Sequence, residues 1–402
     1  MDKQKHFSAF LNKHPDLRFI RLLWIDYTAT LRARVLTVRH MRQMVDTGQN
    51  HGLGRLYMTL IDSDAPLATN DPTAVAGQSY LIPDFSSLRI CGWVAQHAAV
   101  FCHFGEGKLV TGVLRQRISE LCPRFTLQKR LDEAARNGLQ FLVGFEIEFV
   151  CFIPATKGTK IAKSAVHQAS GLRTLEETML PILCRVTEAL EQSGIVVQHF
   201  HAESEKDQFE LVTGPCAPME AVDKLFITRE VIHKVCLDHG VGVSFHPSIP
   251  ARNGLHLNIS LDTDLTIEDS IGEHFLAGIF EHISAIFAFA LPHPESYDRI
   301  VSGHQCVGRY KTWGTHNREV PIRKKGSNFW EMRFLDASTN VYLCLAAIVC
   351  AGLTGVEERS QLKLFDCNGK TVDLSCATTT ADTFDSGSCF DYGGRKTPVR
   401  HH

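Results

Sequence analysis

The segment FLVGFEIEFVCFI, residues 141–153, decides the fold. Glu146 and Glu148 alternate in it with large apolar residues, and side chains along a β-strand point alternately to its two faces. One face of the predicted strand is therefore acidic and the other apolar. The apolar residues at both ends are typical of a buried strand, where two neighbouring carboxylates repel each other unless a cation lies between them. The segment predicts a metal-binding or acid–base role, with an exposed strand as the alternative.

Three further segments combine an apolar back with a polar front. Their polar residues are Glu203 and Glu210 in HAESEKDQFEL, His256, Asn258 and Ser260 in LHLNISL, and Glu331 and Arg333 in FWEMRFL. If all four segments form one sheet, its polar face carries five carboxylates and one imidazole. Buried carboxylates must be paired or bind a cation. A ligand set of many oxygens and one nitrogen suits Mg²⁺ or Mn²⁺ better than zinc.

Four arginines accompany the acidic segments, namely Arg299, Arg318, Arg323 and Arg333. A guanidinium group matches the geometry of a carboxylate or a phosphate, so this set favours a substrate that carries one of these groups. Each arginine alone could also be a solvated surface residue. Two metals and arginines around a phosphate are typical of phosphoryl transfer, whereas the sequence has no P-loop motif and no strand-linked GxGxxG.

The composition is that of an ordinary globular protein. The 402 residues are enough for two or three domains, and 42 Lys and Arg balance 44 Asp and Glu. This balance argues against a nucleic-acid protein with a basic face. The longest apolar stretch, residues 343–353, is too short to span a bilayer and predicts a buried helix. We therefore expect a cytoplasmic protein with neither nucleic acid nor membrane as a partner.

The 13 cysteines are scattered without a CxxC pair, and no secretory signal opens the chain. Reduced and mostly buried thiols are therefore expected. A reactive dyad of Cys102 and His103 is the functional alternative. Neighbours on a strand point to opposite faces, which argues against this dyad.

The pattern of elements divides the chain into three parts. Residues 1–107 predict a small mixed domain in which FIRLLWID and RARVLTV form a hairpin, and FGEGK, residues 104–108, is expected as a turn or boundary. Residues 108–366 alternate strands with helices, but several strands follow one another directly, which favours an antiparallel or mixed sheet with helices on one side. Residues 367–402 predict a low-complexity, disordered tail. Helices are expected at 3–12, 126–137, 172–193, 217–239, 270–291 and 342–357.

The chain resembles the glutamine synthetase family in segments that follow the family's order: GFEIEF, HAESEKDQFELVTGP, NGLHLNISL, SYDRIVSG, WGTHNREVPIR and FWEMRFLDAS. The resemblance covers residues 10–358 and is specific from residue 141 onward; PDFSSLR and FWEMRFLDAS are most similar to fungal FluG-type members. It implies an α+β fold, with an N-terminal β-grasp domain followed by a catalytic split barrel, a curved and mostly antiparallel sheet backed by helices. It also implies a homo-oligomeric ring with active sites between subunits.

The resemblance also implies a role for each site residue by its position. Two metal sites are implied, one held by Glu148, Glu203 and Glu210 and the other by Glu146, His256 and Glu331. The implied substrate-binding residues are Arg299, Arg333 and Gly254. The implied catalytic residues are Arg299, Arg318 and Arg323. The implied nucleotide contacts are Asn258, Ser260, Arg323 and Lys324; Lys324 or Lys325 would also replace a family arginine that has no match near Asn328.

The family reaction uses ATP and Mg²⁺ or Mn²⁺ to convert the γ-carboxylate of glutamate into an acyl phosphate, which ammonia attacks. The sequence departs from the family at two acids that bind ammonium, because Gln305 replaces one and GLGRLYMTLIDSD, residues 52–64, replaces the motif of the other. A glutamine side chain neither accepts a proton nor offsets ammonium charge. We therefore expect a carboxylate–amine ligase that prefers another amine. A catalytically weak developmental or regulatory scaffold and a metal-dependent hydrolase are the alternatives.

Overall fold

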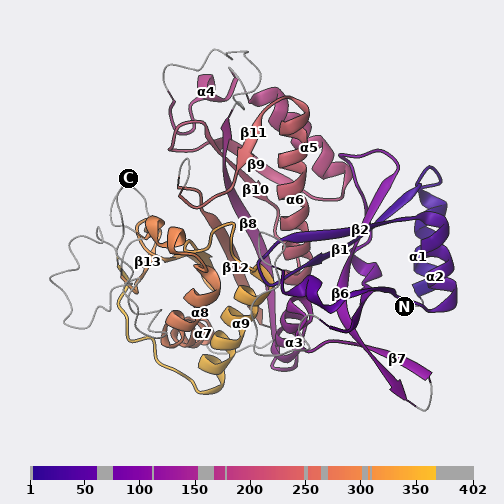
Figure 1. The fold of residues 1–402 in the computed structure, drawn as a ribbon. Helices are drawn as coiled ribbons and strands as arrows, with labels where there is room; N and C mark the ends of the chain where they lie inside the picture. Colours follow the sequence, from indigo (N-terminus) through magenta and orange to yellow (C-terminus); the bar gives the residue numbers. More distant parts are fainter. Residues whose placement is uncertain are drawn as a thin grey trace, which may run out of the picture.

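The computed structural model of the protein describes residues 3–60, 76–110, 113–152, 167–176, 179–248, 252–263, 270–300, 307 and 310–367. In these residues the chain forms two β-sheets with helices packed against them (Figure 1). The N-terminal sheet lies on the right of Figure 1, with α1 and α2 outside it, and the larger sheet occupies the rest of the molecule.

The N-terminal sheet has the strand order β2-β1-β6-β4-β3, and β5 and β7 also pair with β6. Strand β1 runs parallel to β6, whereas the other pairs are antiparallel. The helices of this part are α1 (Lys3–Lys13), α2 (Val38–Thr47), and the 3₁₀ turns Arg55–Met58 and Phe85–Ser87. The strands are β1 (Phe19–Ile25), β2 (Leu31–Thr37), β3 (His51–Gly54), β4 (Gln78–Pro83), β5 (Arg89–Ile90), β6 (His97–Val110) and β7 (Val113–Ile118).

The predicted hairpin of FIRLLWID and RARVLTV is confirmed, since β1 and β2 pair along their whole length. A buried carboxylate, that of Asp26, closes the turn between them. Its Oδ1 accepts hydrogen bonds from the backbone N–H groups of Thr28 and Thr30, both at 3.0 Å, and its Oδ2 lies 2.6 Å from Nε of Arg32. This set of donors holds the turn closed although Ala29 adopts a left-handed φ of 64°.

Strand β1 is buried on both faces and joins two hydrophobic cores. Ile20, Leu22 and Trp24 belong to the core under α1 and α2, whereas Leu23 and Ile25 belong to the large core of the second sheet. Burying a large apolar side chain contributes roughly 1.5–3 kcal/mol. The N-terminal sheet is therefore held against the rest of the chain by apolar packing.

The second sheet has the strand order β13-β14-β15-β12-β8-β10-β9, with β11 also paired to β8. All its pairs are antiparallel except β13 beside β14, which confirms the predicted mixed sheet. Its strands are β8 (Leu139–Phe152), β9 (Val197–Ala202), β10 (Gln208–Thr213), β11 (Gly242–Ser244), β12 (Leu255–Thr263), β13 (Trp313–Thr315), β14 (Ile322–Gly326) and β15 (Phe329–Met332). The helices are α3 (Pro123–Arg136), α4 (Leu172–Glu176), α5 (Leu180–Gln192), α6 (Pro218–Asp238), α7 (Ile271–Glu281), α8 (Ile283–Ala290), the 3₁₀ segment Pro294–Arg299, and α9 (Val341–Glu357).

Helices cover the apolar face of this sheet. Phe145, Ile147 and Phe149 of β8 are at most 2% exposed, and α3 and α6 pack against this strand. The apolar stretch 343–353 lies in α9 and is mostly buried, as predicted. Among the described residues, no helix is both long and apolar enough to cross a membrane.

Two expectations about elements are wrong. FGEGK is not a turn, because β6 continues through it and pairs with β7. Gly105 instead allows close packing against β4, because a Cβ there would lie 2.5 Å from Cδ1 of Ile82. The expected helix 270–291 is broken between α7 and α8 at His282, whose φ of −111° leaves the helical region while the apolar pattern continues.

The expected helix 172–193 appears as α4 and α5, with residues 177–178 outside the described part of the chain. The tail expected at 367–402 also lies outside it, apart from the buried Cys367.

A buried polar network joins the N-terminal sheet to the helices of the second part. Arg124 of α3 contacts Asp223 of α6 through two nitrogens, at 3.1 and 2.9 Å. The same guanidinium contacts Asp84 Oδ2 at 2.8 Å and His103 Nε2 at 2.9 Å. Tyr342 of α9 donates its hydroxyl to Asp223. Four elements that are distant in sequence therefore meet at one guanidinium group.

Candidate active site

The polar residues of the second sheet lie side by side on one face, as the alternation predicted. His256 of β12 lies opposite Glu146 of β8, and Glu210 of β10 lies opposite Glu148 on the other side of β8. Strand β15 brings Glu331 to the same place, with its Oε1 3.4 Å from Nδ1 of His256. The antiparallel register thus assembles one acidic cluster from four strands.

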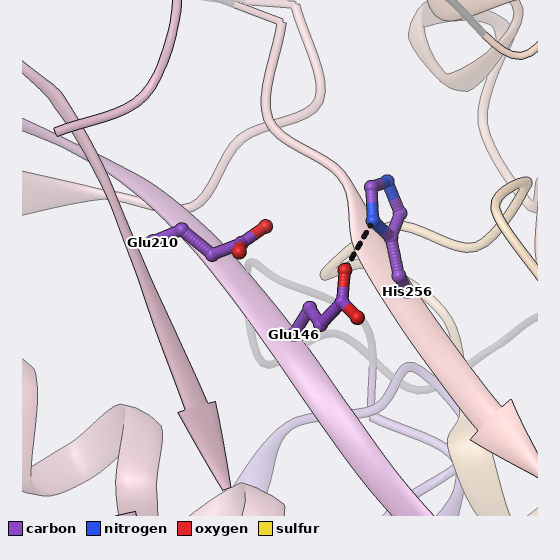
Figure 2. A group of neighbouring side chains, drawn as sticks. All are labelled: Glu146, Glu210 and His256. Atoms are coloured by element: carbon purple, nitrogen blue, oxygen red, sulfur yellow. Dashed lines mark hydrogen bonds and ion pairs between the residues drawn. The ribbon is translucent and has the colours of Figure 1, made fainter. Parts of the chain in front are cut away.

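Glu146, Glu210 and His256 could together hold a metal ion, since one ligand atom from each lies within 4.8 Å of the others. Figure 2 shows the three side chains pointing toward one another from three strands, with the contact of 3.1 Å between His256 Nδ1 and Glu146 Oε2 dashed. The family resemblance implies two metal sites, with Glu210 in one and with Glu146 and His256 in the other, and that division stays a prediction.

The position of Glu210 suits a bound cation. Burial raises its pKa first, the negative charges of Glu146, Glu148, Glu203 and Glu331 raise it further, and it reaches about 9. The side chain is nearly inaccessible, and its nearest basic partner is Nε2 of His201 at 3.7 Å. A buried carboxylate among four others is the chemical setting of a divalent cation site. The residues present therefore fit one metal ion at this end of the cluster.

Metal binding at Glu210 is expected to release a proton near pH 7. Near pH 7, a carboxyl whose pKa is raised from 4.5 to about 9 keeps its proton in the folded, metal-free chain, whereas the same carboxyl is ionised in the unfolded chain. This carboxyl therefore makes folding less favourable as the pH rises from about 4.5 to about 9. Mn²⁺ must displace that proton, so calorimetry at pH 7 in two buffers of different ionisation enthalpy should show about one proton released per ion. Glu210→Gln should abolish this release; equal heats in both buffers with the unsubstituted chain would contradict it.

Glu146 responds in the opposite way to its neighbours. Burial alone would raise its pKa. The hydrogen bond and charge of His256, the hydrogen bond of Asn258 and the charge of Lys325 outweigh burial and hold the pKa well below its usual range. Asn258 Nδ2 donates to Glu146 Oε1 at 2.9 Å. Glu146 is therefore ionised at neutral pH and can act as a ligand or a charged contact.

A cavity of about 450 Å³ opens over the acidic cluster. Among the residues that line it are eight predicted from the sequence: Glu146, Glu148, Glu203, Glu210, His256, Arg299, Arg318 and Arg333. The lining also includes residues that the sequence pattern did not single out: His201, Ser204, Glu205, Gln208, Arg252 and Val307. One cavity therefore presents carboxylates and guanidinium groups to the same ligand.

The family description "Glutamine synthetase, catalytic domain" matches residues 120–380. The chain belongs to the glutamine synthetase family. It is 34% identical over 372 residues to protein fluG of Emericella nidulans, a match that covers 90% of this chain and 41% of that protein. The chain thus spans less than half the length of that relative.

One further relative and one solved structure are similar to this chain. Identity to gamma-glutamylpolyamine synthetase GlnA3 of Streptomyces coelicolor is 27% over 366 residues, which cover 82% of this chain and 74% of that one. The solved GmaS/ADP complex has the same fold, with a TM-score of 0.78 and 19% identity over 96% of this chain and 88% of that one. A curled sheet backed by helices is thus the glutamine-synthetase-type fold.

In this family member, Glu148 is fixed by its neighbours on the cavity floor. Its Oε2 accepts hydrogen bonds from the backbone N–H of Gly254 at 2.6 Å and from Gln208 Nε2 at 3.3 Å. Gln208 is fully buried and also donates to Asn253 Oδ1 at 3.0 Å. A Cβ at residue 254 would lie 2.6 Å from Nη2 of Arg299, so only glycine lets this guanidinium approach. Gln208 could have been found from the sequence, since it is a polar residue two positions before Glu210 in a predicted buried strand.

The arginines of the family set are placed by specific acceptors. Arg299 donates to the backbone oxygen of Leu335 at 2.8 Å and to that of Arg333 at 3.3 Å. Glu331 is held by two guanidinium groups: Nη1 of Arg323 lies 2.9 Å from its Oε2, and Nη1 of Arg333 contacts its Oε1. Burial would raise the pKa of Glu331, but the charge of Arg333, with those of His256 and Lys325, lowers it overall. Both oxygens of Glu331 therefore already face cations.

The two lysines of β14 point to different partners. Nζ of Lys324 lies 5.7 Å from the ring centre of Trp313, away from the acidic cluster. Nζ of Lys325 donates to Asn258 Oδ1 at 3.0 Å and to Glu146 Oε1 at 3.4 Å. The predicted nucleotide contact of Lys324 stays a prediction, and Lys325 is the lysine that the structure brings into the cluster.

Other predictions fall elsewhere. Gln305 lies outside the described residues; of residues 52–64, which replace the ammonium motif, 52–60 are described and form the end of β3 and the 3₁₀ turn Arg55–Met58, whereas 61–64 lie outside. Each of the ten cysteines in the described residues is a free thiol. Burial raises the pKa of Cys102 far above its usual value, and burial and the charge of Arg124 lower the pKa of His103 to about 4. A thiolate–imidazolium pair is therefore disfavoured at this place.

Proposed function

We propose that this chain is an ATP- and Mg²⁺- or Mn²⁺-dependent carboxylate–amine ligase of the glutamine synthetase type. The observation that supports this most is the single cavity in which Glu146, Glu148 and Glu210 face Arg299 and Arg333. Carboxylates alone would suit a metal-dependent hydrolase, but the arginines need an anionic substrate. Members of this family use ATP and divalent metals, and no covalent nucleophile is required of the protein.

In the proposed reaction, a γ-carboxylate oxygen of glutamate or a similar acid attacks the γ-phosphorus of ATP, and ADP leaves. The amine nitrogen then attacks the carbonyl carbon of the acyl phosphate. Inorganic phosphate leaves with the former carboxylate oxygen, and the nitrogen loses a proton. Bound divalent ions would neutralise phosphate charge, and the arginines would stabilise the charge that develops on the transferred group.

We assign the side chains of the cavity to separate parts of the substrates. The substrate carboxylate is assigned to Arg299, Arg333 and Gly254, since the two backbone acceptors of Arg299 fix its guanidinium at the cavity wall. The transferred phosphoryl group is assigned to Arg318 and Arg323. The nucleotide is assigned to Asn258, Ser260, Arg323 and Lys324. Metal ligands are assigned among Glu146, Glu148, Glu203, Glu210, His256 and Glu331.

We further propose that the nitrogen donor is an amine other than ammonia. The support is twofold: Gln305 stands where the family has an ammonium-binding acid, and one relative bears the name gamma-glutamylpolyamine synthetase. An alkylamine or polyamine carries apolar surface that ammonia lacks and does not depend on one anionic pocket for its binding. A scaffold with weak catalysis is the second candidate, supported by the ion pairs that already engage both oxygens of Glu331.

The donor is tested with purified protein, ATP, glutamate and Mg²⁺, by measuring phosphate release with ammonia, methylamine, putrescine and spermidine. We expect release with at least one organic amine to exceed that with ammonia by about tenfold or more, which corresponds to about 1.4 kcal/mol of transition-state discrimination. Release with ammonia alone would contradict the amine proposal. A folded chain that releases none with any donor would favour the scaffold.

We also propose the architecture that the family resemblance implies. The N-terminal part, residues 1–107 by sequence, would be a β-grasp domain, and we propose to extend it to the end of β7 because β6 and β7 pair within its sheet. Residues 108–366 would hold the catalytic split barrel and residues 367–402 a disordered tail. A cytoplasmic homo-oligomeric ring with active sites between subunits completes the proposal; analytical ultracentrifugation that finds a monomer would contradict the ring.

A further inference from the structure

Lys325 stands inside the acidic cluster rather than at its rim. Its side chain is 26% exposed, and its ammonium lies 3.4 Å from Glu146 Oε1 and 4.0 Å from Glu331 Oε2. Asn258 fixes this position, because its Nδ2 donates to Glu146 and its Oδ1 accepts a hydrogen bond from Lys325. The ring of Phe329, 5.3 Å from Nζ, supports the ammonium from the next strand.

The ligand set at this end of the cluster is already engaged by positive charge. Glu331 faces Arg323 and Arg333, and Glu146 faces Lys325 with one oxygen and His256 with the other. The Glu210 end differs in its contacts, because the basic side chain that contacts Glu210 is an imidazole, with Nε2 of His201 3.7 Å from Oε1. Among the described residues, the two halves of the cluster are therefore not equivalent: Glu146 and Glu331 contact lysine and arginine side chains, whereas Glu210 contacts an imidazole.

We propose that the Lys325 ammonium is a resident cation that occupies the Glu146–Glu331 end of the cluster. The chain then binds one divalent ion tightly at the Glu210 end, and a second ion binds there only when Lys325 leaves. A divalent ion placed beside Glu331 would meet three positive side chains within one shell of contacts, and like charges at such distances repel strongly in a partly buried site. The inference rests only on the metal-binding part of the proposed function.

The test is a titration of the full chain with Mn²⁺ in the absence of nucleotide. The electron paramagnetic resonance signal of free Mn²⁺ measures how much of the ion is bound. We compare the unsubstituted chain with Lys325→Met and with Lys129→Met, a matched control that removes a part-buried lysine charge from α3, where its ammonium pairs with Glu120. Lys325→Gln is a second variant in case the methionine variant does not fold, and thermal unfolding in EDTA monitors folding of all four proteins.

We expect one tight Mn²⁺ per chain and a second at least about tenfold weaker in the unsubstituted protein, a gap of about 1.4 kcal/mol. Lys325→Met and Lys325→Gln should tighten the second ion by about tenfold or more, and Lys129→Met should leave both affinities unchanged. Two equally tight ions in the unsubstituted chain, or no change of the second ion in the Lys325 variants, would overturn the inference. No Mn²⁺ binding at all would contradict the metal part of the proposed function as well.

Discussion

Glu146→Gln is expected to reduce ATP-dependent amide formation by at least about 100-fold, the order of loss seen when one electrostatic contact to a reacting phosphate or its metal is removed. Glu146 is the carboxylate on which the cluster converges: His256, Asn258 and Lys325 all contact it. The amide has the same shape but no charge, so it cannot hold a cation or the protonated partners in the same way. Phosphate release under saturating ATP and Mg²⁺ measures the effect.

The control for this variant is Glu188→Gln on the outer surface of α5, where the carboxylate pairs only with Arg185 in an exposed i,i+3 contact. Its phosphate release should equal that of the unsubstituted chain within twofold or so. Glu146→Gln with turnover equal to the control would show that the acidic cluster does not take part in the reaction. Circular dichroism of both variants separates loss of folding from loss of chemistry.

Arg124→Met is expected to lower the free energy of unfolding by about 3–5 kcal/mol, the cost of leaving a buried charge without its partner. Asp223 is 1% exposed and would lose both guanidinium contacts while Tyr342 alone still donates to it. The N-terminal sheet would also lose the contacts that this guanidinium makes to it. Urea denaturation followed by tryptophan fluorescence measures the loss.

Two companion variants decide whether the charge is the cause. Arg124→Met with Asp223→Leu removes both charges and should recover part of the lost stability, because no unpaired carboxylate remains buried. Arg130→Met removes a half-buried arginine from the same helix α3 and should cost much less. A double variant no more stable than Arg124→Met would mean that lost packing, rather than an uncompensated charge, causes the effect.

The polar face of the catalytic sheet could be predicted because it depends on alternation within each strand. Glu146 and Glu148 share a face whatever strands lie beside them. The sequence could not supply the register between strands, and register decides which ligands meet. Glu210 pairs opposite Glu148 and also offers a ligand atom within 4.8 Å of Glu146 and His256, a proximity that the alternation within single strands does not give.

Contacts between distant residues were also beyond sequence reasoning. Arg124 and Asp223 are 99 residues apart, and neither lies in a segment with a polar pattern. The ammonium of Lys325 reaches the cluster from a register shift in β14, since this lysine lies between the pairs Lys324–Trp330 and Gly326–Phe329. Glycine also led to a wrong prediction: the glycines of FGEGK indicated a turn, but the segment continues a long strand, in which Gly105 permits close packing.

The most direct test of the central claim is isotope transfer from the acid to phosphate. Glutamate labelled with ¹⁸O in its γ-carboxylate is incubated with the protein, ATP, Mg²⁺ and the best amine of the panel, and the released phosphate is analysed by mass spectrometry. An acyl phosphate intermediate predicts one ¹⁸O in each phosphate and a γ-glutamyl amide in equal amount. Unlabelled phosphate, or phosphate without amide, would mean that the chain hydrolyses ATP without activating a carboxylate, which would contradict the ligase function.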